Sequence, residues 1–475
     1  MKRRLAIGFG GVLVLLLLAA GVLALVVIRH NEPELHAGIE DHFKYGSIGA
    51  EARSGIPERI WYVLPKVFPE HLPQGEGDGY ARLGFIYEPG QKRPIGTSRR
   101  ENPVASVGVN CAVCHTGTVR DSAEAAPRIV LGMPANTFDL RGYIDFLRAA
   151  GRDPRFNADT LLKAMRDDGQ KLSWWESRLY RHFVIPRTEK ALKDLDRDFS
   201  WVDKRPPWGP GRVDTFNPYK DLLGLDLSID DTIGTSDLPT IWNQRRRDGM
   251  YLHWDGNNSS LSERNKSAAI GAGATPASLD LKAMKRIEDW ILDFPPPAFP
   301  GDRIDARKAE AGARLYAQQC ASCHDFDGAQ VGQVSPLADI GTDGERLRSF
   351  DEETARRMNT IGEGRPWAFS HFRKTDGYVN MPLDGVWLRA PYLHNGSVPT
   401  MRALLFPEER PDVFYRRYDV YDYADLGFVS SGAAAERVGF RFDTTLPGNG
   451  NEGHLYGTQL PPADREAILE YLKTR

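Results

Sequence analysis

The sequence has 475 residues, of which 41% are hydrophobic and 26% are charged, and its formal net charge is −3 at pH 7. A chain of this length can hold two or three domains with sizeable cores, and the composition is that of an ordinary globular protein. Because neither the net charge nor any stretch of the chain is strongly basic, we expect no nucleic-acid partner.

Residues 1–30 combine a short basic segment with a long apolar run. Lys2, Arg3 and Arg4 precede an uncharged run from residue 5 to residue 28. As a helix this run would span about 36 Å, more than the ~30 Å hydrocarbon core of a bilayer. The basic flank should stay cytoplasmic, which predicts a single-pass inner-membrane anchor with the bulk of the chain in the periplasm. A cleaved signal peptide is the alternative, although the run is longer than usual and ends without a small-residue cleavage site.

Residues 31–110 are rich in Gly and Pro and predict loops and short helices around a first cofactor site. The site is a Cys-x-x-Cys-His motif, the attachment signature of c-type haem. Its two thiols can reach the two vinyl groups of one porphyrin, and its His can give an imidazole nitrogen to the iron. A second copy of the motif lies in the second half of the chain. The residues of the two motifs are Cys111, Cys114, His115, Cys320, Cys323 and His324.

The two motifs use all 4 cysteines of the chain, so no structural disulfide can form. A zinc site would need both cysteine pairs to converge and would leave both histidines unexplained. The sequence therefore predicts two covalently bound haem c groups. Such haems are attached outside the bacterial inner membrane, which agrees with the predicted anchor.

Helical periodicity follows the first motif in residues 140–149, 160–165 and 174–183. The Pro- and Gly-rich residues 206–211 break this pattern, and we expect a loop over residues 200–235. Later helices are expected over residues 279–294, over 304–319 leading into the second motif, and over 462–473 at the end of the chain.

Few runs have the period of a strand, so we predict a mainly α fold. An N-terminal transmembrane helix (residues 1–30) precedes a first cytochrome c-like haem domain with a loop-rich insertion (residues 31–294). A Pro-rich linker (residues 295–301) joins it to a second cytochrome c-like haem domain (residues 302–475).

The two halves share a further pattern. Each haem motif is followed by a Trp and then by Tyr-Leu-His and a turn, at Trp242 and residues 251–253 in the first half and at Trp387 and residues 392–394 in the second. The repeated order predicts a duplicated module. His253 and His394 can equally be hydrogen-bonded structural histidines at these turns.

The repeated segments resemble the bacterial di-haem cytochrome c peroxidase superfamily. The resemblance rests on Trp254-Asp255-Gly256, on the helix start that follows it, and on residues 390–396, which read Ala-Pro-Tyr-Leu-His-Asn-Gly. Residues 45–51, 209–214 and 453–457 are similar to the branch that contains the di-haem rubber oxygenase. The resemblance covers nearly everything after residue 30.

This resemblance implies roles for individual residues. Trp254 would lie between the haems and relay electrons, although a Trp at a domain interface can also serve packing alone. His394 would lie beside the second haem. The Met that often ligates the second iron of these peroxidases is replaced by Glu408, whereas the rubber-oxygenase branch uses a distant His whose position matches His454. The resemblance thus implies His454 as the sixth ligand.

His394 and Met381 are the alternative sixth ligands, and a His454 exposed in a loop is the structural alternative. For the first haem, residues 230–237 contain no His or Met where the superfamily has its distal His, and His182 and His253 are the histidines between the motifs. Neither is assigned as a ligand. This pattern predicts an open or weakly ligated first haem that could bind O₂ or H₂O₂.

The loop around residues 208–216 is the candidate distal wall of the first haem. Arg212 could steady bound oxygen as a fixed cation, and Trp208 and Phe216 could shield it. The alternative for these aromatic residues is packing alone. No acid–base His or Glu can be assigned.

Three functions follow from these features. The first is a membrane-anchored periplasmic di-haem oxidoreductase that activates O₂ or H₂O₂ at the first haem, with the second haem transferring or storing electrons. The second is a cytochrome c peroxidase that takes electrons from a small cytochrome or a quinol-linked donor. The third is a non-catalytic electron-transfer cytochrome. The absence of the usual Met favours the first over the second.

Overall fold

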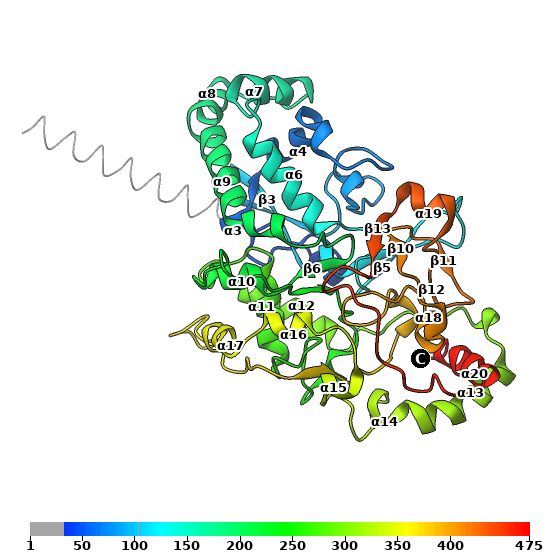
Figure 1. Ribbon diagram of the computed structural model, residues 1–475. Coiled ribbons are helices and arrows are strands. Elements are labelled where there is room, and N and C mark those ends of the chain that lie inside the picture. Colours follow the sequence, from blue (N-terminus) through cyan, green and yellow to red (C-terminus); the bar gives the residue numbers. More distant parts are fainter. Residues whose placement is uncertain (1–32, 103) are drawn as a thin grey trace, which may run out of the picture.

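The computed structural model describes residues 33–102 and 104–475 (Figure 1). The predicted anchor in residues 1–30 lies outside the described residues. Within the described ranges no helix is both long enough and apolar enough to cross a bilayer. The described residues thus give no support to the predicted transmembrane helix or to the single-pass inner-membrane location predicted from it.

The predicted mainly α class is wrong, because helices and sheets are mixed along the chain. The described residues form one three-stranded sheet in the order β1-β3-β2 and five two-stranded ladders, all antiparallel. The strands are β1 Ile56–Pro57, β2 Thr97–Asn102, β3 Val104–Val109, β4 Thr116–Val119, β5 Arg128–Leu131, β6 Arg212–Asp214, β7 Thr235–Asp237, β8 Val334–Pro336, β9 Gly377–Val379, β10 Val413–Arg416, β11 Tyr421–Asp422, β12 Gly427–Phe428 and β13 Phe440–Asp443.

The helices of the first half carry most of its core. They are α2 Ile39–Tyr45, α3 Glu51–Ser54, α4 Glu58–Val67, α5 Cys111–Cys114, α6 Leu140–Arg152, α7 Ala158–Asp167, α8 Trp174–Leu179, α9 Ile185–Asp198, α10 Asn217–Leu222, α11 Leu261–Gly271 and α12 Leu281–Ile291. Those of the second half are α13 Ala306–Gln319, α14 Ala321–His324, α15 Leu337–Ile340, α16 Glu345–Ser349, α17 Glu352–Met358, α18 Met401–Leu405, α19 Gly432–Val438 and α20 Pro462–Leu472.

The strongly periodic helices are confirmed. The helix expected over residues 140–149 is α6, which starts where the Asp139 side chain accepts a hydrogen bond from the Gly142 amide. The entry helix α13 and the terminal helix α20 pack against each other near Gly312, where an added Cβ would lie 1.9 Å from the Ala467 carbonyl oxygen. This close approach requires a residue without a side chain.

Residues 200–235 are not the uniform loop that the sequence predicts. They contain β6 and α10, and β6 pairs with β7 so that Arg212 lies opposite Asp237. This pairing brings residues 212–214 to the strand that precedes Pro239, close to the first haem motif.

Buried apolar residues from both sides of the predicted linker, residues 295–301, pack in one cluster. One cluster joins Val119, Val130, Met133 and Trp242 of the first half to many residues of α18, α20 and the segment around Trp387. The two halves therefore pack against each other through a shared apolar core.

Two buried ion pairs also join the halves. Arg346 contacts Asp255 at 2.9 Å, and both side chains are 2% exposed. Arg416 contacts Asp237 at 2.5 Å, and both side chains are 3% exposed. Because a buried charge is costly without its partner, each pair fixes how one half sits on the other.

Replacing Arg346 by Met is expected to destabilise the protein by about 3–5 kcal/mol, because the Asp255 carboxylate would remain buried without its counter-charge. Denaturant unfolding of the haem-loaded protein measures the change. The double variant R346M/D255L should recover much of the loss, since no charge is then left unpaired. Wild-type stability in R346M alone would show that the pair does not join the halves.

Candidate functional site

The first haem motif sits on α5 and is held by Asn110. The Asn110 side chain accepts a hydrogen bond from the Ala112 amide and donates to the Gly46 carbonyl oxygen at 2.9 Å. Burial raises the pKa of Cys111 and of Cys114 to about 12, so both thiols are protonated at neutral pH. No disulfide joins any of the four cysteines.

His115 follows α5 and has a defined tautomer. Its Nδ1 lies 2.9 Å from the Pro239 carbonyl oxygen, which can only accept, so Nδ1 carries the proton. The lone pair is then on Nε2, the arrangement of a metal-ligating imidazole with an outer hydrogen bond. Burial lowers the pKa of His115 to about 4, which keeps the ring neutral at pH 7.

His324 repeats this arrangement at the end of α14. Its Nδ1 lies 2.8 Å from the Met381 carbonyl oxygen, and burial lowers the pKa of its ring. Burial also raises the pKa of Cys320 to about 11. We call His115 and His324 the proximal histidines.

His454 faces His324 across a short gap. The two ring centroids are 6.1 Å apart and the ring planes are tilted by 41°. Two imidazoles that bind one metal from opposite sides are separated by about this distance, because each metal–nitrogen bond is about 2 Å long. The residues present therefore fit a covalently attached haem with a histidine on each side.

The backbone at His454 is unusual and firmly held. Its φ is +50°, a conformation that few non-glycine residues adopt, and its amide donates to the Ile340 carbonyl oxygen at 2.7 Å. Its Nδ1 is buried without a hydrogen-bond partner, and burial lowers the pKa of the ring to about 4. Strained backbone of this kind is frequent at ligand-binding positions.

Trp254 connects the two segments whose carbonyl groups contact the proximal histidines. We call these carbonyl groups, of Pro239 and Met381, the proximal carbonyl groups. The Trp254 Nε1 donates to the Asp237 carbonyl oxygen at 2.8 Å, and Asp237 precedes Pro239 by two residues. Its own carbonyl oxygen accepts from the Val379 amide at 2.8 Å, and Val379 precedes Met381 by two residues. A continuous path of bonds and hydrogen bonds thus runs from one proximal histidine through Trp254 to the other.

The duplicated turns are confirmed, but in a register that differs by one residue from the Tyr-Leu-His match. Leu252 pairs with Asn258, and Tyr392 pairs with Val398. In each turn the first residue donates its amide to the carbonyl oxygen of the second at 2.7 Å. The structure therefore aligns Leu252 with Tyr392, and the Tyr-Leu-His sequence match, which is shifted by one residue, is coincidental.

Left-handed backbone at matching positions supports this register. His253 and Leu393 have φ of +64° and +68°. Trp254 then corresponds to His394, whose carbonyl oxygen accepts from the Asp237 amide at 2.9 Å. Trp254 of the first half thus contacts β9, which precedes Met381, and His394 of the second half contacts β7, which precedes Pro239.

His394 is buried and held by Tyr378. The rings stack with centroids 4.0 Å apart. The Tyr378 hydroxyl donates to the Asp343 carbonyl oxygen at 2.8 Å, so its oxygen accepts from His394 Nε2 at 3.0 Å. Burial, followed by the charges of Arg346 and Arg212, lowers the pKa of His394 well below its usual value. Met381, the other alternative ligand, supplies its carbonyl oxygen to His324.

The three residues of the candidate distal wall do not form one cluster. Trp208 is buried in one cluster with Trp201. Phe216 instead packs on Phe350, with ring centroids 4.7 Å apart, and the Arg346 guanidinium lies over its ring. Arg212 is fully buried, with its guanidinium over the Phe442 ring.

Arg212 contacts the second half of the chain. Its guanidinium donates to the carbonyl oxygens of Trp208 at 3.1 Å and of Gly448 at 3.3 Å. Its Nε is buried without a partner. Burial and the charge of Arg416 lower its pKa to about 9.

Within the part of the chain that the structure describes, no contact places Glu408 or either histidine between the motifs against a proximal histidine. His182 is exposed, and His253 Nδ1 lies 2.5 Å from the Asn257 side-chain oxygen. Glu408, at the position of the usual Met, accepts from Arg465 at 3.0 Å.

Two cations beside the proximal histidines were not predicted. The charge of Arg264 adds to burial in lowering the pKa of His115, and Arg389 acts in the same way on His324. Arg389 is held by Asp384 at 2.7 Å. Both arginines lie outside any recognisable motif, and only the folded structure brings them to the histidines.

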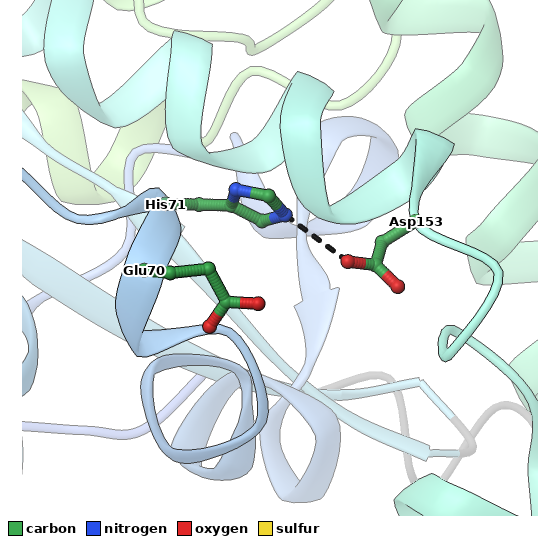
Figure 2. A group of neighbouring side chains, drawn as sticks. All are labelled: Glu70, His71 and Asp153. Atoms are coloured by element: carbon green, nitrogen blue, oxygen red, sulfur yellow. Dashed lines mark hydrogen bonds and ion pairs between the residues drawn. The ribbon is translucent and has the colours of Figure 1, made fainter.

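A third group of side chains has the composition of a metal site. Ligand-type atoms of Glu70, His71 and Asp153 lie within 4.8 Å of one another, at the 3₁₀ helix Pro69–His71 and just after α6 (Figure 2). Arg155 pairs with Asp153 at 2.6 Å and also with Glu70. Its guanidinium lowers the pKa of Asp153 and already supplies the positive charge, so we assign no metal here.

Comparison with known families identifies cytochrome c domains in the second half. Residues 377–415 match the family "RoxA-like, cytochrome c-like". Residues 307–374 match "Cytochrome C oxidase, cbb3-type, subunit III". The first of these ranges contains Met381, whose carbonyl oxygen contacts His324, and the second contains the whole second haem motif.

Two similar proteins come from Sinorhizobium fredii. The chain is 31% identical over 285 residues to the uncharacterized protein y4iM, a match that covers 50% of this chain and 64% of that protein. It is 26% identical over 498 residues to the uncharacterized protein y4iJ, covering 83% of this chain and 81% of that protein. The chain thus spans less than two thirds of the length of y4iM.

The motifs and the domain matches support a cytochrome c haem family. The cytochrome c domains imply haem c as the cofactor and indicate haem-based electron transfer or redox chemistry.

Proposed function

We propose that this chain is a di-haem c-type cytochrome oxidoreductase similar to the rubber-oxygenase branch. In it, O₂ or H₂O₂ is activated at the haem held by His115, and electrons are transferred or stored at the haem held by His324. The match to RoxA-like proteins supports this assignment over a general cytochrome. We further propose a small redox protein or a quinol-linked donor as the partner.

The observation that carries the proposal is the unequal surroundings of the proximal histidines. His324 faces His454, with ring centroids 6.1 Å apart. Among the described residues no second imidazole packs against His115 in this way. Haem c supplies a redox-active iron, and only an iron with a free coordination position can take up O₂ or peroxide. The asymmetry therefore favours chemistry at the first site and electron storage at the second.

The chain's own residues would divide the remaining tasks. Pro239 and Met381 orient the proximal rings through their carbonyl oxygens. Trp254 connects the two sites. Arg212, with its Nε lacking a protein partner, is the candidate cation for bound oxygen.

Removing one cysteine pair at a time tests this division. Both C111A/C114A and C320A/C323A are expected to lose one of two covalent haems, measured by intact mass. The haem left in C320A/C323A should bind carbon monoxide, and the haem left in C111A/C114A should not. Equal binding by both variants would contradict the unequal sites. Steady consumption of H₂O₂ with a reduced cytochrome would select the peroxidase alternative.

A further inference from the structure

Three large aromatic side chains are exposed on one helical segment at one end of the molecule. Trp174, Trp175 and Phe183 are 76%, 55% and 68% exposed. They belong to α8 and to the π-helical turn Tyr180–Val184 that follows it. Figure 1 shows α7 and α8 at the end of the molecule opposite α13, α14 and α20. We call these three side chains the aromatic tip.

The fold does not need the aromatic tip to hold α8. The helix starts with a capping box formed by Ser173 and Glu176, and Glu176 also pairs with Arg59 at 3.1 Å. Behind it, Tyr180 and Ile185 are buried in the core. Single exposed apolar residues are common, but a group of large aromatic residues marks an interaction surface.

The charges around the aromatic tip are predominantly basic, although the whole chain has a net charge of −3. The nearby carboxylates are paired with cations: Asp159 with Arg181, Glu176 with Arg59 and Glu189 with Lys193. Among the described residues, the side chains of Lys171, Arg178 and Arg187 are exposed and make no hydrogen bond or ion pair. The same helical segment thus carries both unpaired cations and exposed aromatic rings.

We propose that the aromatic tip docks on an anionic lipid surface. Tryptophan and phenylalanine settle at the boundary between headgroups and acyl chains, and nearby Lys and Arg side chains bind anionic headgroups. A protruding tip requires no shape-matched groove when its partner is a fluid bilayer. The contact is peripheral, uses residues 171–187, and is independent of the proposed redox function.

Tryptophan quenching by brominated phosphatidylcholine tests the docking on the full-length haem-loaded protein. With vesicles that also contain phosphatidylserine, the wild type should be quenched, and W174F/W175F should lose that quenching because its tip carries no fluorophore. Quenching that persists in W174F/W175F, or none in the wild type, would overturn the proposal. This readout follows the tip itself, whichever other segment touches the vesicle.

The role of charge is tested by R178E/R187E. Each basic residue contributes about 1 kcal/mol at an anionic surface, so its binding to phosphatidylserine vesicles should fall by roughly tenfold or more. The matched control R307E/K308E changes two exposed cations on α13, at the opposite end, and should bind as the wild type does. Equal binding to neutral and anionic vesicles would overturn the anionic preference, and a tip that binds an acidic protein but no vesicle would overturn the lipid proposal.

Discussion

Replacing His454 by alanine is expected to convert one of the two haems from a low-spin to a high-spin state. The His454 and His324 rings face each other at a distance suited to two ligands of one iron. Alanine leaves that iron with one protein ligand and an open face, and a weaker ligand field follows. Electron paramagnetic resonance of the resting protein, which counts ligation states, measures the change together with the visible spectrum.

Added imidazole should restore the low-spin signal of H454A, because it can occupy the same face without the backbone. H182A is the matched control, since His182 is an exposed histidine far from both motifs in sequence, and its spectrum should equal that of the wild type. An unchanged spectrum in H454A would refute the ligand assignment. Variants of His394 and Met381 would then show which alternative supplies the ligand.

The haem motifs and the long helices could be predicted from the sequence because their signals are local. Cys-x-x-Cys-His carries its chemistry within five neighbouring residues, and the buried residues of α6 and α13 recur at the helical period. The end of α8 was predicted less well. Its π turn, Tyr180–Val184, continues directly into α9, and no sequence signal marks such a junction.

The sheets could not be predicted, because most strands are too short to show a period. Strand β11 has 2 residues and β8 has 3, and β8 pairs with β9, Gly377–Val379, which lies well away in sequence. Even β3, with 6 residues, was hidden in a segment rich in Gly and Pro. Strand pairing depends on tertiary context, and this is why a mainly α fold was expected.

The register of the repeat shows a different limit. The identical Tyr-Leu-His sequences align His253 with His394, whereas the backbone pairing aligns Trp254 with His394. Residue identity reports a duplication only while the side chains keep the same task. Here the retained features are a left-handed turn and a carbonyl oxygen that contacts the other half, and many residue types can supply both.

Replacing Trp254 by Phe is expected to slow electron exchange between the two haems while leaving their spin states unchanged. The variant keeps the carbonyl oxygen that accepts from Val379 but loses the indole and its bond to the Asp237 carbonyl oxygen. The path between the proximal histidines is thereby interrupted at one point. A slowing on the order of tenfold corresponds to a barrier raised by about 1.4 kcal/mol. Rapid reduction followed by absorbance at both haems measures the rate.

W387F separates this effect from the loss of any buried indole. Trp387 is fully buried, and its Nε1 donates to the Pro297 carbonyl oxygen at 3.0 Å, away from the path between the proximal carbonyl groups. Both variants lose one hydrogen bond worth about 1 kcal/mol of stability, but only W254F should exchange electrons slowly. Wild-type exchange in W254F would leave Trp254 with a packing role alone. Slow exchange in both variants would instead indicate a general loosening between the halves, because only a specific path distinguishes one indole from the other.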